Sequence, residues 1–133
     1  MVGRWIGHLP QGRFVHNKIA NASPIRGELL LGWSVHYAIG VGFATLLVAL
    51  FGLDWLRQPT IVPALVVGVV TVVLPLFVLQ PGMGLGIAAT KAPSPNAARL
   101  RSLMSHTIFG VGLYVAALGV CAADAAITVS TQL

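Results

Sequence analysis

The chain has 133 residues, of which 56% are hydrophobic and only 8% are charged. A soluble domain carries about 25% charged residues, so this composition excludes an ordinary water-soluble globule and indicates a membrane protein. The net charge of +5 comes from basic residues that flank apolar runs and form no patch, which argues against a nucleic-acid partner. The single cysteine, Cys121, excludes a disulfide framework and a CxxC metal or redox motif.

The chain contains three apolar segments long enough to cross a bilayer as helices, which takes about 20 residues each. We therefore expect an all-α, polytopic transmembrane protein, with the lipid bilayer as its first partner. In chain order, the expected parts are a basic inner segment (1–28), a first span (29–53), an outer loop (54–60), a second span (61–79), an inner loop (80–103), a third span (104–123) and an outer tail (124–133). Leucines at helical spacing among arginines in residues 94–104 favour a short helix on the inner membrane surface.

The distribution of lysine and arginine predicts the orientation. Only Arg57 lies between the first and second spans. Seven basic residues lie before the first span or between the second and third: Arg4, Arg13, Lys18, Arg26, Lys91, Arg99 and Arg101. Because cytoplasmic loops retain positive charge, we expect the N-terminus inside and the C-terminus outside, in an inner membrane.

The glycine-rich stretch QPGMGLGIAAT fits a G-x-G-x-x-G/A pattern at Gly84, Gly86 and Ala89. A dinucleotide site needs a short strand before the glycines and an acidic residue about 20 positions later. Here a 19-residue apolar run precedes them, and the next acidic residue is Asp124. The stretch is instead interpreted as the end of the second span, and no cofactor is expected. Pro75, inside that span, predicts a kink or a free carbonyl.

The chain also shows a weak internal repeat at an offset of 70 residues. The segment HYAIGVGFA, from His36, aligns with HTIFGVGLY, from His106. Both copies run from inside to outside, which predicts a parallel repeat of two helical hairpins. Ser23-Pro24 before the first span and Ser94-Pro95 before the third each resemble a helix N-cap followed by proline. The repeat also predicts a counterpart of the second span, ending near His8 or Leu9.

Three stretches, VGRWIGHLPQGRF, RGELLLGWSVHYAIGVGFA and LPLFVLQPGMGLGIAATKAPSPNAARLRSLMSHTIFGVGLY, resemble a bacterial integral-membrane family known as domain of unknown function 2938. The resemblance runs from Val2 to about Ala117. It implies a further apolar helix ahead of the VGRW segment, and hence four helices in two hairpins. It implies no activity.

His36 and His106 are the candidate site residues. His36 lies about six residues inside the first span, a depth of about 9 Å. An ionisable side chain at such depth needs a partner and suggests function. A metal site normally needs three or four ligands, and His8, His16 and Gln80 would complete one only by folding back. Interhelical hydrogen bonding by neutral histidines is the favoured interpretation.

Small residues on the first and third spans predict close helix contacts, within one chain or between subunits. The predicted packing residues are Gly32, Gly40, Gly42, Gly110, Gly112 and Ala116.

Three hypotheses about function follow. The favoured one is a non-catalytic scaffold or accessory membrane component, partnered by a second copy or another membrane subunit. A small oligomeric transporter or channel is the alternative, supported by the repeat and Pro75 but not by the polarity of the second span. An enzyme or metal binder using His36 and His106 is the third.

Overall fold

The computed structural model describes residues 1–130, and all of the regular structure within them is helical. The α-helices are α1 (Val2–His8), α2 (Glu28–Phe51), α3 (Leu53–Arg57), α4 (Ile61–Val70), α5 (Gln80–Gly82) and α6 (Pro95–Ser130). Short 3-10 turns cover Leu9–Gln11, Ile19–Asn21 and Ile87–Ala89, and a wider π turn covers Pro75–Leu79. Residues 131–133, the end of the predicted outer tail, lie outside the described residues.

Three helical stretches are long and apolar enough to cross a membrane: Glu28–Phe51, Ile61–Gly82 and Pro95–Thr128. The prediction of an all-α chain with three such helices is confirmed. The first of them is the least covered by the rest of the chain. In its most apolar stretch of 18 residues, 6% is buried, against 22% in the second.

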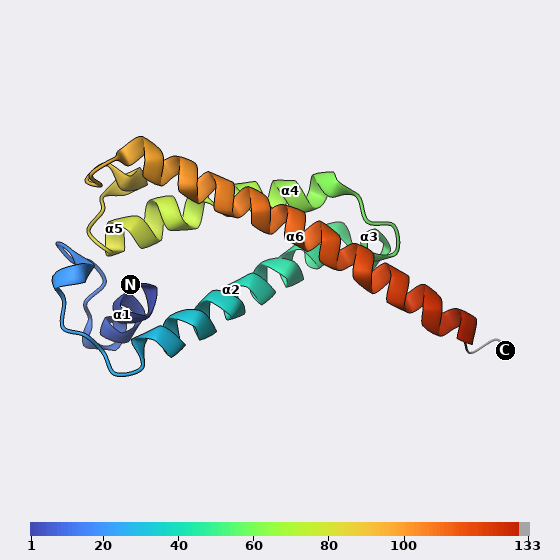
Figure 1. The fold of residues 1–133 in the computed structure, drawn as a ribbon, viewed down its shortest axis with the longest axis horizontal. Helices are drawn as coiled ribbons and strands as arrows, with labels where there is room; N and C mark the ends of the chain where they lie inside the picture. The colour runs from blue at the N-terminus through green and yellow to red at the C-terminus, as the bar shows by residue number, and fades with distance from the viewer. Residues whose placement is uncertain (131–133) are drawn as a thin grey trace.

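The helices form two hairpins that open like a V (Figure 1). The first consists of α1 and α2, and the second consists of α4, α5 and α6, with both turns at the same end of the molecule. The hairpins meet near α3. There a small apolar core forms from Leu47, Trp55, Ala64, Val67 and Ala117. This core joins α2, α3, α4 and α6 at one end of the V. At the opposite end, the segment after α1 contacts the end of the second span through backbone hydrogen bonds.

Pro75 interrupts the second span, as predicted. Proline has no N–H for the α-helical ladder, and its ring crowds the preceding turn. The regular helix ends at Val70, and the next turn tightens, because the N–H of Val72 donates to the carbonyl of Val69 at 3.1 Å. The chain then widens through Pro75–Leu79 before α5 resumes the helix.

The third span differs from its prediction in length. α6 begins at Pro95 and contains 36 residues, which corresponds to about 54 Å. The helix predicted in residues 94–104 is present, but it is continuous with the third span and is not a separate short helix. Alanine, arginine and leucine are good helix formers, and nothing there breaks the helix. Residues 124–130, predicted as outer tail, also continue the helix.

The two predicted N-caps have different outcomes. The carbonyl of Ser94 accepts the N–H of Ala98 at 3.1 Å, so Ser94 caps α6 ahead of Pro95, as predicted. The cap expected at Ser23 is wrong. α2 begins only at Glu28, after Gly27, whose φ of 78° lies in the left-handed region that glycine adopts readily. Gly27 is the residue immediately before α2.

The closest crossing of two long helices lies between Gly68 of α4 and Gly110 of α6. A Cβ atom placed on Gly68 would lie 2.6 Å from the Cα of Gly110 and 2.7 Å from the carbonyl oxygen of His106. One placed on Gly110 would lie 2.9 Å from the carbonyl oxygen of Ala64. These backbones approach closely because neither residue has a side chain, which is the common way for membrane helices to gain packing contacts.

We predict that Gly68→Ala destabilises the chain by about 2–3 kcal/mol, because the new methyl group meets backbone atoms that cannot move aside. Thermal unfolding in detergent, followed by circular dichroism, measures the change. Gly112→Ala is the matched control. A Cβ there has no neighbour within 4 Å, so the unfolding temperature should stay the same or rise. Equal effects of the two substitutions would contradict the crossing.

Candidate functional site

α1 is fastened to the start of α2 by a charged pair. The guanidinium of Arg4 donates to both carboxylate oxygens of Glu28, at 2.8 and 2.7 Å, and to the carbonyls of Ala20 and Ala22 at 3.2 Å. The hydrogen bond to Glu28 raises the pKa of Arg4 above its usual value. Next to this pair, Gly3 packs directly on the backbone of Glu28, where any side chain would collide. The short helix α1 is therefore held against the first turns of α2.

The N-terminal segment also contacts the loop that follows the second span. The N–H of His16 donates to the carbonyl of Gly82 at 2.9 Å, and the N–H of Ile19 donates to that of Met83 at 3.1 Å. Gly84 has a φ of +88°, and a side chain on it would collide with the carbonyl of Asn17. These contacts bring the two segments predicted to be cytoplasmic to the same end of the molecule.

His106 lies at the crossing of α4 and α6. Its Nδ1 is 3.1 Å from the hydroxyl of Thr71 and 3.1 Å from the carbonyl of Gly68. The Thr71 hydroxyl itself donates to Gly68 at 2.8 Å. A carbonyl can only accept, so Nδ1 carries the hydrogen and donates it to Gly68 and Thr71. The imidazole therefore joins two spans by hydrogen bonds inside the apolar part of the chain.

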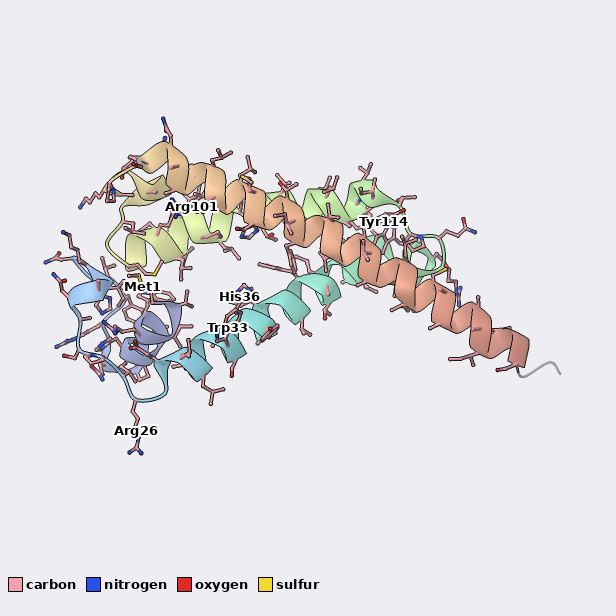
Figure 2. All side chains as sticks on the ribbon, in the orientation of Figure 1. Met1, Arg26, Trp33, His36, Arg101 and Tyr114 are labelled. Carbon is pink, nitrogen blue, oxygen red and sulfur yellow. The ribbon has the colours of Figure 1, made fainter. Side chains whose placement is uncertain are left out.

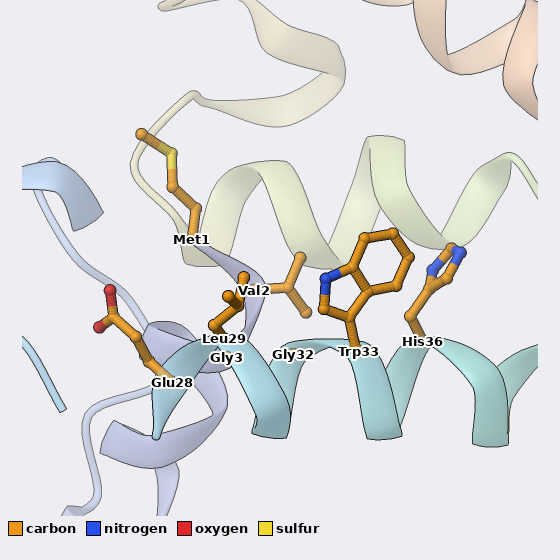
Figure 3. Close-up of a pocket in the computed structure, with 8 residues that line it drawn as sticks. All are labelled: Met1, Val2, Gly3, Glu28, Leu29, Gly32, Trp33 and His36. Atoms are coloured by element: carbon orange, nitrogen blue, oxygen red, sulfur yellow. The ribbon is translucent and has the colours of Figure 1, made fainter. Parts of the chain in front are cut away.

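His36 has quite different surroundings. Its side chain is exposed, and its ring contacts Trp33 edge-on, with centroids 5.8 Å apart, and Tyr37 at 6.1 Å. It lines a groove of about 370 Å³ together with Trp33, Gly32 and the first residues of α1. Figure 3 shows Trp33 and His36 standing on the same side of α2, beyond Val2. No hydrogen bond links His36 to any other side chain in the described part of the chain.

The structure thus gives the two candidate histidines separate partners. His8 and His16 form another pair near the N-terminus, with ring centroids 5.3 Å apart, and His8 is also hydrogen-bonded to Ser23 at 3.0 Å. Within residues 1–130, no three His, Cys, Asp or Glu side chains lie close enough together to hold a metal ion. The metal hypothesis for His36 and His106 therefore gains no support from the donor geometry.

The predicted packing residues divide by location. Gly32 contacts Gly3, and Gly110 contacts Gly68. Gly40 has the ring of Phe109 at 3.8 Å. Gly42 and Gly112 have open space where a Cβ would stand, and Ala116 is exposed. The first three thus pack within the chain, and the others present small surfaces outward.

Gly68 and Thr71 were missed by the sequence analysis, which took the second span to lack polar residues. Thr71 lies within that span, 8% exposed, and it supplies the hydroxyl that His106 contacts. A glycine and a threonine three residues apart share one face of a helix, and this spacing was the available signal. Gln80, 6% exposed, was likewise expected only in a loop, but its amide donates to the Ser102 hydroxyl at 3.2 Å and joins α5 to α6.

Comparison with known proteins identifies the family. The family model described as "Protein of unknown function (DUF2938)" matches residues 1–120. The chain belongs to the DUF2938 family. The match covers both hairpins and most of α6, in agreement with the resemblance inferred from the sequence. No curated protein and no solved structure matches this DUF2938 chain.

We predict that Thr71→Val in this DUF2938 chain lowers its stability by about 1 kcal/mol, because it removes one hydrogen-bond partner of His106 while keeping the shape of the side chain. Thermal unfolding in detergent reports the loss. The matched control is Thr45→Val, since the Thr45 hydroxyl bonds only to Val41 of its own helix at 3.0 Å. In ¹⁵N spectra, the His106 Nδ1 should carry a proton, and finding it unprotonated would contradict the assigned donor.

Proposed function

We propose that this chain is a non-catalytic component of a bacterial inner membrane, acting as a helix-packing scaffold or accessory subunit. One observation supports the proposal above the others. The candidate residue His106 uses its Nδ1 in contacts with Thr71 and Gly68, and these contacts join two helices. Neither partner is a carboxylate, and the Thr71 hydroxyl donates its hydrogen to the Gly68 carbonyl and not to the imidazole, so His106 is not placed to act as its general base.

The charge distribution supports an orientation with the N-terminus inside. Figure 2 shows Arg26 and Arg101 toward the end where both hairpins turn, with Tyr114 much nearer the opposite end. The other basic residues of the N-terminal segment and the 80–94 loop belong to this same end. At the opposite end, Arg57 is paired with Asp54 at 3.0 Å, and both side chains are exposed. Positive charge is retained on the cytoplasmic side during insertion.

The outward small residues support a role in assembly. Gly42 on α2 and Gly112 on α6 are related by the 70-residue offset, and neither has a neighbour where a Cβ would stand. Ala116 lies one turn after Gly112 and is also exposed. Small residues on a lipid-facing surface allow another helix to approach closely. We propose that these positions contact a second copy or another membrane subunit.

A bulky residue at Gly42 tests the assembly role. Gly42→Leu should leave the isolated fold intact, because the position is open, but it should reduce the native mass of the detergent-purified protein toward the 13.9 kDa monomer. Gly119→Leu, at another open position, is the matched control and should leave the mass unchanged. A wild-type protein that is already monomeric would exclude a second copy as the partner. A His36→Ala/His106→Ala variant tests the metal alternative, since stoichiometric metal lost only from this variant would favour it.

A transporter or channel is the second candidate, and the interrupted second span favours it. Thr71 and Val72 form a turn between α4 and the π turn that begins at Pro75. Breaks of this kind expose backbone groups, and in transporters they lie beside substrate or ion sites. A path through the membrane would need an oligomer, because three spans do not surround one.

Flux into proteoliposomes tests this second candidate. If the break serves transport, Pro75→Ala should repair the helix and reduce uptake several-fold while stability rises. Pro63→Ala, in the first turn of α4, is the matched control because proline is tolerated there. Uptake equal to that of empty vesicles for a panel of ions and small solutes would remove the transporter from consideration.

A further inference from the structure

A second pocket, of about 410 Å³, lies where the segment after α1 meets the loop that follows the second span. Both segments lie at the end of the molecule where the hairpins turn (Figure 1). The segment after α1 contributes Val15, His16 and Asn17 to the lining, and the loop contributes Ile87, Thr90 and Lys91. The pocket thus brings four polar side chains and two apolar ones together from distant parts of the chain.

Two glycines give this pocket its shape. Gly84 lets the carbonyl of His16 pack against the loop, where a Cβ atom would collide with it. Gly86 has a φ of +75°, and a Cβ atom on it would lie 3.0 Å from the Cγ of Lys91 and would collide with the Thr90 hydroxyl. The N–H of Lys91 also closes this turn by donating to an earlier carbonyl of the loop at 2.8 Å. The backbone that carries the polar side chains is therefore fixed by close packing.

His16 is the unsatisfied group of the pocket. Both of its ring nitrogens are shielded from solvent, and neither has a hydrogen-bond partner among the described residues. A neutral imidazole has one N–H donor and one acceptor, so leaving both unpaired away from water costs free energy. The neighbouring His8 supplies no partner, because its own nitrogens contact Gln11 and the carbonyl of Ser23. Since the Cβ–Cγ torsion of histidine has broad preferences, a turn of the His16 ring can direct an N–H toward a ligand in the pocket.

The surroundings of the pocket are positively charged. The chain has three acidic residues, and none of them lines the pocket. Glu28 and Asp54 each form an ion pair with an arginine, and Asp124 lies near the opposite end, in the last part of α6 (Figure 1). Lys91 therefore has no acidic partner in the part of the chain that the structure describes. A ligand that complements Lys91 and the unpaired imidazole is an anion.

We propose that this pocket binds the phosphate group of an anionic glycerophospholipid. The Lys91 ammonium supplies the opposite charge, and the His16 ring and the Thr90 hydroxyl donate hydrogen bonds to phosphate oxygens. Val15 and Ile87 are 73% and 60% exposed beside these polar groups, so they offer apolar contacts to the glycerol and acyl parts of a lipid. A free phosphate ion has no such parts.

The membrane orientation supports a lipid as the source of the phosphate. In the orientation proposed above, this end of the molecule lies at the cytoplasmic surface, where anionic headgroups attract basic side chains. The choice of a lipid over a soluble phosphate rests on that proposed function. The anion site itself rests on the pocket, the unpaired imidazole and Lys91.

Titration of the detergent-purified protein with a short-chain phosphatidylglycerol tests the site. The ¹⁵N signals of the His16 ring should change and reach saturation. Lys91→Gln should weaken the apparent affinity about five- to tenfold, because it removes a charge-assisted hydrogen bond. Lys18→Gln is the matched control, since it removes the same charge two residues from His16 but outside the pocket lining, and it should leave the affinity nearly unchanged.

His16→Phe separates hydrogen bonding from packing. Phenylalanine keeps an aromatic ring beside His8, and the backbone hydrogen bond from residue 16 to Gly82 does not involve the side chain. Without lipid, the unfolding temperature should not fall, because the imidazole has no hydrogen bond to lose. Native mass spectrometry should show that His16→Phe retains phosphatidylglycerol at several-fold lower occupancy than the wild type, as Lys91→Gln does.

The remaining outcomes overturn the inference. Equal weakening by Lys91→Gln and Lys18→Gln would show a general attraction of anions to this end and no site, as would the absence of a saturable change at His16. Inorganic phosphate that binds as tightly as phosphatidylglycerol would replace the lipid by a soluble phosphate as the ligand. Phosphatidylcholine that binds equally well would show that anionic charge is not selected. None of these results bears on the Gly42→Leu assembly test, which measures the mass of the protein alone.

Discussion

The close approach of α4 and α6 at Gly68 and Gly110 is the constraint on which the rest of the structure depends. Lipid offers no hydrogen-bonding partner and little hydrophobic drive between helices, so a membrane helix pair is stabilised by close packing and by polar contacts that packing permits. The glycine crossing brings the Gly68 carbonyl and the Thr71 hydroxyl to His106. It also places Ala64 and Val67 in the core that Leu47 joins from α2. The second hairpin is thus the stable unit, and the first is attached to it.

The first hairpin is stabilised differently, mostly where α1 meets the start of α2. Arg4 and Glu28 form the strongest polar contact between α1 and α2, and Gly3 lets the two backbones meet. The side chains of Arg4 and Glu28 are 20% and 28% exposed, so this charged pair is only partly buried. Away from these contacts α2 has little cover, apart from Leu47 and the ring contact between Phe43 and Phe109, whose centroids are 6.1 Å apart. The same helix therefore carries the open groove at His36 and the outward surface at Gly42.

His36 and His106 show that one residue type can make different contacts at matching places in a repeat. They share a motif and a place in the repeat, yet His106 is held by two polar groups and His36 is exposed beside Trp33. The difference comes from the contacts of each helix pair: α4 meets His106 through Thr71 and Gly68, whereas α1 contacts α2 at Glu28 and Gly32. A histidine in a span is therefore interpretable only with the helix opposite it, which is why the packing role is better supported for His106 than for His36.

The sequence by itself determined the all-α class, the three spans, the break at Pro75 and the start of α6 after Ser94, because hydropathy, proline and capping act locally along the chain. It placed His106 in a span but not beside Thr71, and it overlooked Gly68, because contacts between residues 35 or more positions apart depend on how helices rotate and cross. It also divided α6 into a surface helix and a span, since composition changes there while helix propensity does not. Only the tertiary structure decided which glycines pack, because a glycine matters only where another backbone approaches it.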